Sequence, residues 1–294
     1  MAPLRIATRG SRLALWQAER VATLLGGDAE LVVVSTTGDQ RTDVPISTIG
    51  GTGVFVKEVE QAVLDGRADL AVHSAKDLPS ETAEGLVLAA VPERADPRDA
   101  LVGARLDAIP AGGTVGTGSV RRQAQLAALR PDLRFVSIRG NIETRIGKAG
   151  GDVDAVVVAF AALERLGLAG RAAEVLDPAL MLPQVAQGAL AVECRAGDGE
   201  CAGRLAAIDD PAARRAVEAE RAFLRQLGGG CDLPCGALAD AGPDGPVALE
   251  VLLATLDGKA VLRVSHAGTD PGVVGSEAAR ILLDEQGGRD LLNP

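Results

Sequence analysis

The chain begins with LRIATRGS at residues 4–11, followed by RLALWQAERVATLL at residues 12–25. The first segment alternates as a strand does, and the second carries apolar residues at helical spacing until Gly26. LVVV at residues 31–34 is an apolar run of strand length. Strand, helix and strand in this order predict an α/β fold. The polar turn at residues 9–11 lies at the carboxyl end of the first strand, where ligands bind in open α/β sheets.

The same alternation continues along the chain. Polar or glycine-rich residues 37–43 and 50–53 indicate loops, and the charged, proline-bearing residues 92–99 indicate a crossover to a second α/β unit. Residues 182–188 indicate the return crossover, after which a strand is expected to rejoin the first sheet. The expected strands are 68–73, 86–91, 114–116, 135–138, 155–160, 189–194, 247–256 and 260–266, and the expected helices are 55–64, 120–129, 211–227 and 273–283.

These patterns predict three domains. Residues 1–94 with 189–207 form the first α/β domain, residues 98–186 form the second, and residues 211–294 form a small α+β domain. A chain of 294 residues is long enough for this division. The final segment contains a glycine run, residues 228–230, that leads directly into Cys231.

Composition restricts the classes of partner. Aromatic residues make up only 2% of the chain and the net charge is −10, so we expect no nucleic-acid partner. The amino-terminal strand leaves no room for a signal peptide, and no apolar run reaches 18 residues. The four cysteines do not make a disulfide scaffold. We therefore expect a cytoplasmic protein that does not bind membranes.

Arginine recurs at three turns of similar design. All but four of the 30 basic residues are Arg, the side chain best suited to bidentate capture of carboxylate or phosphate. Each turn joins a strand to a helix start, where free N–H groups also favour anions. Single arginines at such places are usually solvated surface groups, but three turns together predict a cleft for a ligand with several negative charges. The turns are residues 9–11, 116–122 and 139–145.

Two further features could take part in a reaction. Lys76 and Asp77 follow the strand that ends near His73, and a carboxylate among cations there could stabilise a developing positive charge. A salt-bridged turn is the plain alternative for Lys76 and Asp77, and His73 is assigned no role because a buried histidine is more often part of a core. Cys231 is presented by three glycines, which favours a nucleophile or covalent anchor.

The remaining cysteines favour structural roles. Cys194 is expected in a strand and Cys201 in a polar turn, and both, like Cys235, are interpreted as small apolar residues. The spacing of Cys231 and Cys235 would permit zinc if a further Cys or His pair were close, but the sequence offers none nearby, so no metal is predicted.

Seven motifs, in order, resemble the porphobilinogen deaminase (hydroxymethylbilane synthase) family from about residue 4 to residue 240. They are ATRGS (7–11) with LALWQA (13–18), FVKE (55–58), AVHSAKD (71–77), SVRRQ (119–123), RGN (139–141) with Arg145, QGA (187–189) and GGC (229–231). The resemblance implies two periplasmic-binding-protein-like domains of type II and a small third domain. It also implies a transferase of tetrapyrrole and haem biosynthesis, active as a monomer.

The resemblance further implies a dipyrromethane cofactor, linked through a thioether to Cys231. Four porphobilinogen molecules would be joined to it head-to-tail with loss of ammonia, and hydroxymethylbilane would be released by water. Asp77 would be catalytic. Contacts to the cofactor would come from Lys76, Asp77, Ser119, Arg121, Arg122, Arg139 and Gly188, and contacts to substrate from Arg9, Ser11, Phe55, Arg139, Arg145 and Arg165.

Two other functions stay open at this point. A cytoplasmic receptor for an anionic metabolite would also use a two-domain α/β fold, but it leaves Asp77 and the glycine–cysteine loop unexplained. A zinc enzyme that uses the cysteines is the third alternative. The chain also departs from the family pattern, because it has Thr48 and Thr52 where many relatives have lysines, Gly118 where serine is common, and Cys235 as an additional thiol.

Overall fold

The computed structural model describes residues 3–27, 29–40, 53–229 and 233–292. Two compact units divide the chain. Met1–Arg94 and Ala189–Arg214 form unit 1, and Ala95–Gly188 and Arg215–Pro294 form unit 2. The backbone therefore passes between the units near residues 94–95 and 188–189, and again near residues 214–215 within one helix.

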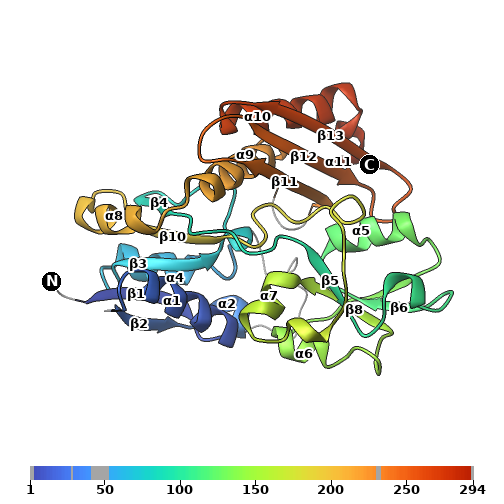
Figure 1. The fold of residues 1–294 in the computed structure, drawn as a ribbon, viewed down its shortest axis with the longest axis horizontal. Coiled ribbons are helices and arrows are strands. Elements are labelled where there is room, and N and C mark those ends of the chain that lie inside the picture. Colours follow the sequence, from blue (N-terminus) through green and yellow to red (C-terminus); the bar gives the residue numbers. More distant parts are fainter. Residues whose placement is uncertain (1–2, 28, 41–52, 230–232, 293–294) are drawn as a thin grey trace. The chain divides into compact units, whose positions relative to one another are not determined.

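Unit 1 contains a five-stranded mixed sheet (Figure 1). The strand order is β2 (Ala29–Val34), β1 (Leu4–Arg9), β3 (Leu70–Ser74), β10 (Leu190–Arg195) and β4 (Leu86–Ala90). The first three strands are parallel, and β10 is antiparallel to both of its neighbours. The strand predicted to rejoin the first sheet is thus confirmed, and it lies inside the sheet.

Helices cover both faces of this sheet because alternate residues of each strand point to opposite sides. Ile6 of β1 packs with Val21 of α1 (Arg12–Leu24) and Leu205 of α8 (Gly199–Leu205). Ala7 faces the other way and packs with Val59 of α4 (Lys57–Leu64). Each face therefore has its own apolar core, and the carboxyl ends of β1 and β3 are left at one edge.

The first sheet of unit 2 repeats this arrangement. Its order is β7 (Arg134–Val136), β6 (Thr114–Gly116), β8 (Ala155–Ala159), β5 (Asp99–Val102) and β9 (Ala172–Val175). Here β5 is the internal antiparallel strand. One core joins it to α5 (Val120–Leu129), and the opposite core joins it to α6 (Ile142–Ile146) and α7 (Phe160–Arg165).

The rest of unit 2 is a three-stranded antiparallel sheet with helices. The sheet consists of β11 (Cys235–Ala241), β12 (Val247–Ala254) and β13 (Val261–Gly268), and the helices are α9 (Pro211–Leu227), α10 (Pro271–Arg280), a π-helical turn (Ile281–Glu285) and α11 (Gly288–Leu292). A Cβ at Gly275 of α10 would collide with the backbone of α9, so glycine permits the close helix contact. No helix in the described parts of the chain has the length and apolarity needed to cross a bilayer.

The α/β class with a small carboxyl-terminal α+β part is confirmed. The exact limits of the three predicted domains stay a prediction. Two local predictions were wrong. Residues 37–40 form a helical turn, α2 (Thr37–Gln40), because Glu58 accepts hydrogen bonds from the Thr37 N–H and hydroxyl, at 2.9 and 2.6 Å. Cys201 lies buried in α8 instead of a polar turn. Predicted loop residues 41–52, with Thr48 and Thr52, lie outside the described residues.

Candidate active site

The turn after β1 is organised by local hydrogen bonds. Ser11 is the N-cap of α1, and its hydroxyl accepts a hydrogen bond from the Ala14 N–H at 3.3 Å, as the sequence predicted. The Thr8 hydroxyl donates to the Ala14 carbonyl at 3.1 Å. These contacts fix the backbone on both sides of Arg9, the last residue of β1.

The Arg9 guanidinium lies over the ring of Phe55, with its central carbon 4.2 Å from the ring centroid. This is the geometry of a cation–π contact. A Cβ at Gly38 would collide with the same ring, so glycine at this position allows Phe55 to occupy its place. The structure thus brings together two of the predicted substrate residues, Arg9 and Phe55.

The turn after β3 carries Lys76 and Asp77. Both are half-buried in a 3₁₀ turn, Ala75–Asp77. Its start is held by two contacts, since the buried Gln17 amide donates to the Ser74 hydroxyl at 2.8 Å and the Ala75 N–H donates to the Ala189 carbonyl at 3.1 Å. The polar turn is therefore attached to both α1 and the start of β10.

Next to this turn along the chain, a buried polar cluster joins β3 to β10 and α4. His73 Nε2 lies 3.4 Å from Glu193 Oε2, and both side chains are almost fully buried. Glu60 of α4 is also buried, and its pKa is raised by that burial and then by the negative charge of Glu193. Sequence analysis assigned His73 no role, and it did not identify Glu60 or Glu193.

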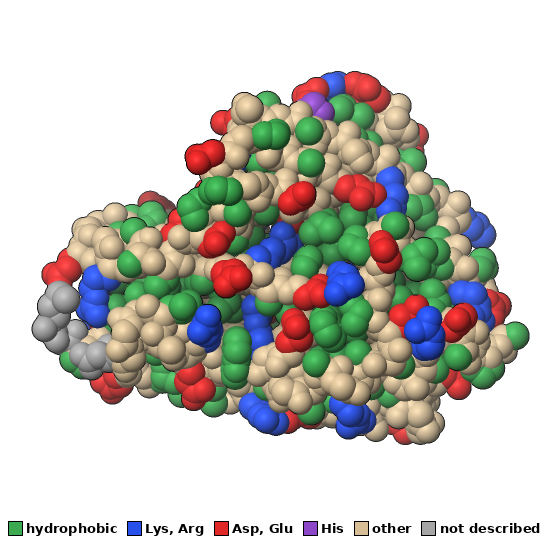
Figure 2. Space-filling model, in the orientation of Figure 1, with side chains coloured by type: hydrophobic (Ala, Val, Ile, Leu, Met, Phe, Trp, Pro, Cys, Tyr) green, Lys and Arg blue, Asp and Glu red, His purple; other side chains and the backbone are tan. Residues whose placement is uncertain are grey.

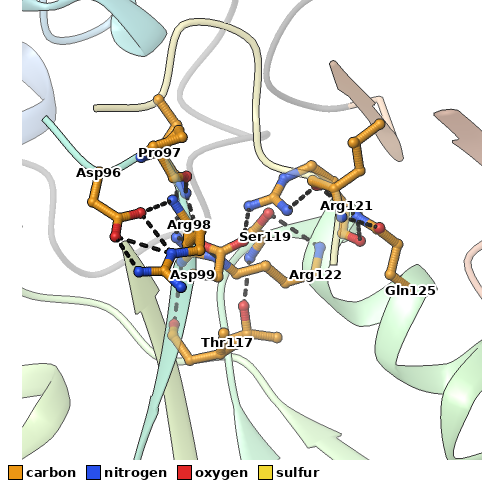
Figure 3. A network of polar contacts seen from close by, with 12 residues as sticks. Asp96, Pro97, Arg98, Asp99, Thr117, Ser119, Arg121, Arg122 and Gln125 are labelled. Atoms are coloured by element: carbon orange, nitrogen blue, oxygen red, sulfur yellow. Dashed lines mark hydrogen bonds and ion pairs between the residues drawn. The ribbon is translucent and has the colours of Figure 1, made fainter. Parts of the chain in front are cut away.

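In unit 2 the second arginine turn leads into α5. Ser119 is the N-cap, and its hydroxyl accepts a hydrogen bond from the Arg122 N–H at 3.4 Å. Arg121 and Arg122, however, are almost fully buried, with exposed fractions of 2% and 6%. They point toward Asp99, the first residue of β5 (Figure 3).

The Asp99 carboxylate bonds to both arginines. Arg122 donates to Oδ1 through Nε at 3.0 Å and Nη2 at 2.8 Å, and Arg121 Nη2 lies 2.8 Å from Oδ2. Burial of the carboxyl would raise its pKa, but the two arginines, assisted by Gln187, outweigh this and lower the pKa of Asp99 to about 2. The Asp99 carboxylate thus supplies part of the negative charge that arginines at this helix start require.

One carboxylate against two guanidinium groups leaves a net positive charge in a buried place. The Arg121 Nη1 donates to the Leu182 carbonyl at 2.7 Å, but Arg121 Nε has no hydrogen-bond partner among the described residues. Such a group is costly unless a further acceptor reaches it. The arginine pair is therefore suited to a carboxylate ligand in addition to Asp99.

The third arginine turn is more exposed. Asn141 is the N-cap of α6 and accepts hydrogen bonds from the Thr144 N–H and hydroxyl, at 2.8 and 2.9 Å. Arg145 Nε donates to the Gly140 carbonyl at 2.8 Å. Arg139, which precedes Gly140 in the sequence, is half-buried. This turn offers its cations at the surface of unit 2, unlike the buried pair.

Arg165 and Gly188 are also brought together. Arg165 Nη2 donates to the Gly188 carbonyl at 2.6 Å, and burial lowers the pKa of this guanidinium to about 10. Gly188 has φ of 89°, and a Cβ there would collide with the Ala95 carbonyl. Only glycine fits this contact between the outgoing and returning segments.

Cys231 lies outside the described residues, so the predicted anchor has no described geometry. Cys235 is buried at the start of β11, and Cys194 and Cys201 are buried together in unit 1. Burial raises the pKa of the Cys201 thiol to about 12, which makes it a poor nucleophile. Within the described ranges, no group of three or more His, Cys, Asp or Glu could hold a metal ion.

On the face shown in Figure 2, acidic and basic side chains are mixed and do not gather by sign.

Sequence reasoning missed Asp99 and assigned Gln187 no individual role. The requirement of buried arginines for an anion was the available signal, and the nearest acidic residue in the crossover segment could have been named from it.

Two family models together match most of the chain. Residues 4–203 match "Porphobilinogen deaminase, dipyromethane cofactor binding domain", and residues 214–284 match "Porphobilinogen deaminase, C-terminal domain". Among solved structures, the VFT2 domain of BvgS from Bordetella pertussis is 20% identical, with a TM-score of 0.40, and covers 70% of this chain and 86% of its own. That likeness is too low to support a statement about function.

Relatives with high identity extend over nearly the full chain. A porphobilinogen deaminase of Nitratidesulfovibrio vulgaris is 49% identical over 293 residues, which is 97% of this chain and 92% of the relative. Those of Brevibacillus brevis and Roseiflexus castenholzii are 44% and 48% identical, and the matches cover 99% and 98% of this chain and 97% and 98% of those proteins. With both family models and these relatives in agreement, the chain belongs to the porphobilinogen deaminase family.

Proposed function

We propose that this chain performs the family reaction with the residues described above. The reaction joins four porphobilinogen units head-to-tail, with loss of ammonia at each addition. Hydrolysis by water then releases hydroxymethylbilane. The observation that carries the proposal is the buried arginine pair, Arg121 and Arg122, which faces a single carboxylate. Each pyrrole of substrate and cofactor carries an acetate and a propionate, so the ligand supplies the negative charge that this site lacks.

The dipyrromethane cofactor fits the donor set. We infer that it is held through a thioether on Cys231, and that Arg121, Arg122 and Ser119 bind its carboxylates, together with Lys76, Arg139 and Gly188. When bound, the cofactor supplies a terminal pyrrole with a free ring carbon to which the first substrate is joined. The unpaired Nε of Arg121 is the buried donor that supports this assignment.

We assign substrate binding to residues of unit 1 and to three half-buried arginines of unit 2. Arg9 and Ser11 would bind the substrate carboxylates, and Phe55 would pack against the pyrrole face. The cation–π contact supports this pairing, because Arg9 is held beside the ring on which the substrate would stack. Arg139, Arg145 and Arg165 would neutralise the additional carboxylates as the chain grows.

Asp77 is the proposed catalytic residue. Loss of ammonia leaves positive charge on the pyrrole nitrogen, and an ionised carboxylate close to that nitrogen stabilises it. Each coupling then forms one carbon–carbon bond and releases one proton from the ring carbon that is attacked. The turn that carries Asp77 is fixed by Gln17 and Ala189, which limits the movement of the carboxylate during the reaction.

We further propose a monomeric cytoplasmic enzyme with neither nucleic-acid nor membrane partners. The acidic composition and the low aromatic content support this proposal. A receptor for an anionic metabolite is not favoured, because both matched family models describe a deaminase.

Intact mass with a turnover assay tests the proposal. Purified protein should be heavier than its sequence by two linked pyrrole units, and Cys231→Ser protein should have the bare sequence mass. The control variant Asp77→Ala should keep the added mass yet lose turnover by about 10²-fold or more. An active wild type with the bare sequence mass would contradict the covalent cofactor, and near-normal turnover of Asp77→Ala would remove Asp77 from the mechanism.

A further inference from the structure

The two segments that cross between the units are bonded to each other within unit 2. The Ala95 N–H donates to the Gly188 carbonyl at 3.2 Å, and the Gln187 side-chain amide donates to the Pro97 carbonyl at 2.8 Å. Residues 95–98 and 185–188, called here the crossover pair, lie directly beside the unit boundaries.

The crossover pair is also bonded to the arginine pair, and Asp99 makes the link. Gln187 Nε2 donates to Asp99 Oδ1 at 3.0 Å, the same oxygen that accepts both hydrogen bonds from Arg122. Arg122 Nη2 in turn lies 3.4 Å from Gln187 Oε1. Asp99 is fully buried and Gln187 equally so. A change at the guanidinium groups can therefore reach the crossover pair through Asp99 Oδ1, and also through the longer Arg122–Gln187 contact.

The crossover pair carries backbone strain that needs such support. Ala186 has φ of 58°, the sole positive value of a non-glycine residue in the described ranges. Its N–H donates to Glu220 Oε2 at 2.6 Å, and Oε1 of this buried carboxylate accepts from the Ala239 N–H at 2.9 Å. The returning segment is thus held by Glu220 on one side and by Asp99, through Gln187, on the other.

We propose that Asp99 is a positioning residue that couples the occupancy of Arg121 and Arg122 to the order of the crossover pair. A carboxylate ligand that reaches the arginines shares their donors with Asp99. It also places a new fixed charge beside the cluster, so the carboxylate–Gln187 contact changes with occupancy. The inference rests on the proposed function for the identity of the ligand, the carboxylates of the cofactor. The coupling itself depends on contacts among Asp99, Gln187 and the two arginines.

Amide hydrogen exchange of the crossover pair, followed by peptide mass, tests this coupling. The full-length wild type and Asp99→Asn are each compared with and without Cys231→Ser, which removes the cofactor. In the wild type we expect exchange at residues 95–98, which include no proposed cofactor contact, to be about tenfold slower when the cofactor is attached. In Asp99→Asn this difference should disappear, whereas a purely structural residue would shift both forms equally and leave the difference intact.

Asp96→Asn is the matched control. Asp96 lies in the same segment and binds Arg98 through Nε and Nη2 at 2.9 and 2.6 Å, but the described contacts do not link it to the arginine pair. The Asp96→Asn variant should retain the tenfold difference in exchange between cofactor-bound and cofactor-free protein. If Asp99→Asn does not fold, Gln187→Met replaces it, because this variant keeps the ion pairs of Asp99 and removes the link, together with the hydrogen bond from Gln187 to the Pro97 carbonyl. A retained difference in either variant overturns the coupling.

The same samples separate this inference from the proposed function. Absence of added mass in the wild type refutes the cofactor proposal. In that case the coupling to the cofactor falls with the proposed function, and the same samples test only the support that Asp99 gives the crossover pair, where Asp99→Asn must still exchange about tenfold faster than Asp96→Asn. Equal rates would overturn it. If the wild type carries the added mass and the exchange difference between cofactor-bound and cofactor-free protein is the same in Asp99→Asn as in the wild type, only the coupling is refuted.

Discussion

Both five-stranded sheets bury one carboxylate on their internal antiparallel strand, but they neutralise it differently. In unit 2, Asp99 of β5 faces Arg121 and Arg122. In unit 1, Glu193 of β10 faces His73 and lies near Glu60, and among the described residues no arginine forms an ion pair with either carboxyl group. The two sheets have the same spatial pattern of strand directions, with the antiparallel strand next to one edge strand in each, so this pattern does not decide the difference.

The difference shows how a buried charge is tolerated. Removal of a carboxylate from water is expensive unless cations and hydrogen bonds compensate. Asp99 has both, and its pKa falls. The cluster in unit 1 holds carboxyl groups beside one histidine, and there burial raises the pKa of Glu60. The surroundings in unit 2 therefore favour the charged form of Asp99, whereas burial in unit 1 favours the protonated form of Glu60.

The largest expected effect comes from matched carboxyl-to-amide changes. Asp99→Asn leaves two buried guanidinium groups without a counter-charge, and we expect a loss of about 3–5 kcal/mol in the free energy of unfolding of unit 2. Glu193→Gln changes a carboxyl group that has no ion pair with an arginine among the described residues, and should change the stability of unit 1 by about 1 kcal/mol or less. Hydrogen exchange of β8 and β3 reports each unit separately. A larger loss for Glu193→Gln would reverse the comparison.

An acid titration should separate Asp99 from other carboxylates. Its folded pKa of about 2 lies below the ordinary value, so its contribution is fully present above the unfolded pKa and is lost as the pH falls through about 2. The stability difference between wild type and Asp99→Asn should therefore shrink by about 2 kcal/mol between pH 4 and pH 2. Exchange of β8 amides at each pH measures it, and a constant difference would contradict the assignment.

The smallest expected effect has the opposite sign and belongs to unit 1. The pKa of Glu60 is raised in the folded state, so the folded protein keeps a proton that the unfolded chain has lost, and stability falls as the pH rises through that raised value. Glu60→Gln lacks this loss and should gain stability relative to the wild type with rising pH. Urea unfolding from pH 4 to pH 8 measures the gain.

Glu19→Gln, at an exposed position of α1, is the control for Glu60→Gln and should show no such trend. A Glu60→Gln curve parallel to the wild type would show that Glu60 is charged in the folded protein. The cluster in unit 1 would then resemble that of unit 2 more closely than its contacts indicate.

The sequence predicted the features that depend on neighbouring residues. Ser11 was predicted as an N-cap, and the Ser119 and Asn141 turns were predicted to precede helices, because a polar residue before an amphipathic run has a local signal. Strands β5, β9 and β11 were not predicted. Their sequences are short or, as in CGALADA of β11, lack a clear apolar alternation.

The contacts that define the buried clusters could not be predicted in the same way. Arg122 meets Asp99 across 23 positions and Gln187 across 65, and His73 meets Glu193 on another strand. Such contacts depend on sheet order, which a single sequence leaves open. The roles of Asp77, the arginines and Cys231 rest on the family resemblance and stay proposals.

The position of β10 has a consequence for synthesis of the chain. This strand lies between β3 and β4, yet it is made after all strands of the first sheet of unit 2. When residue 175 has been synthesised, the sheet β7–β6–β8–β5–β9 has all of its strands, while β3 and β4 still lack the partner that joins them. The sheet that begins the polypeptide is therefore completed second, and until then it exposes two unpaired strand edges.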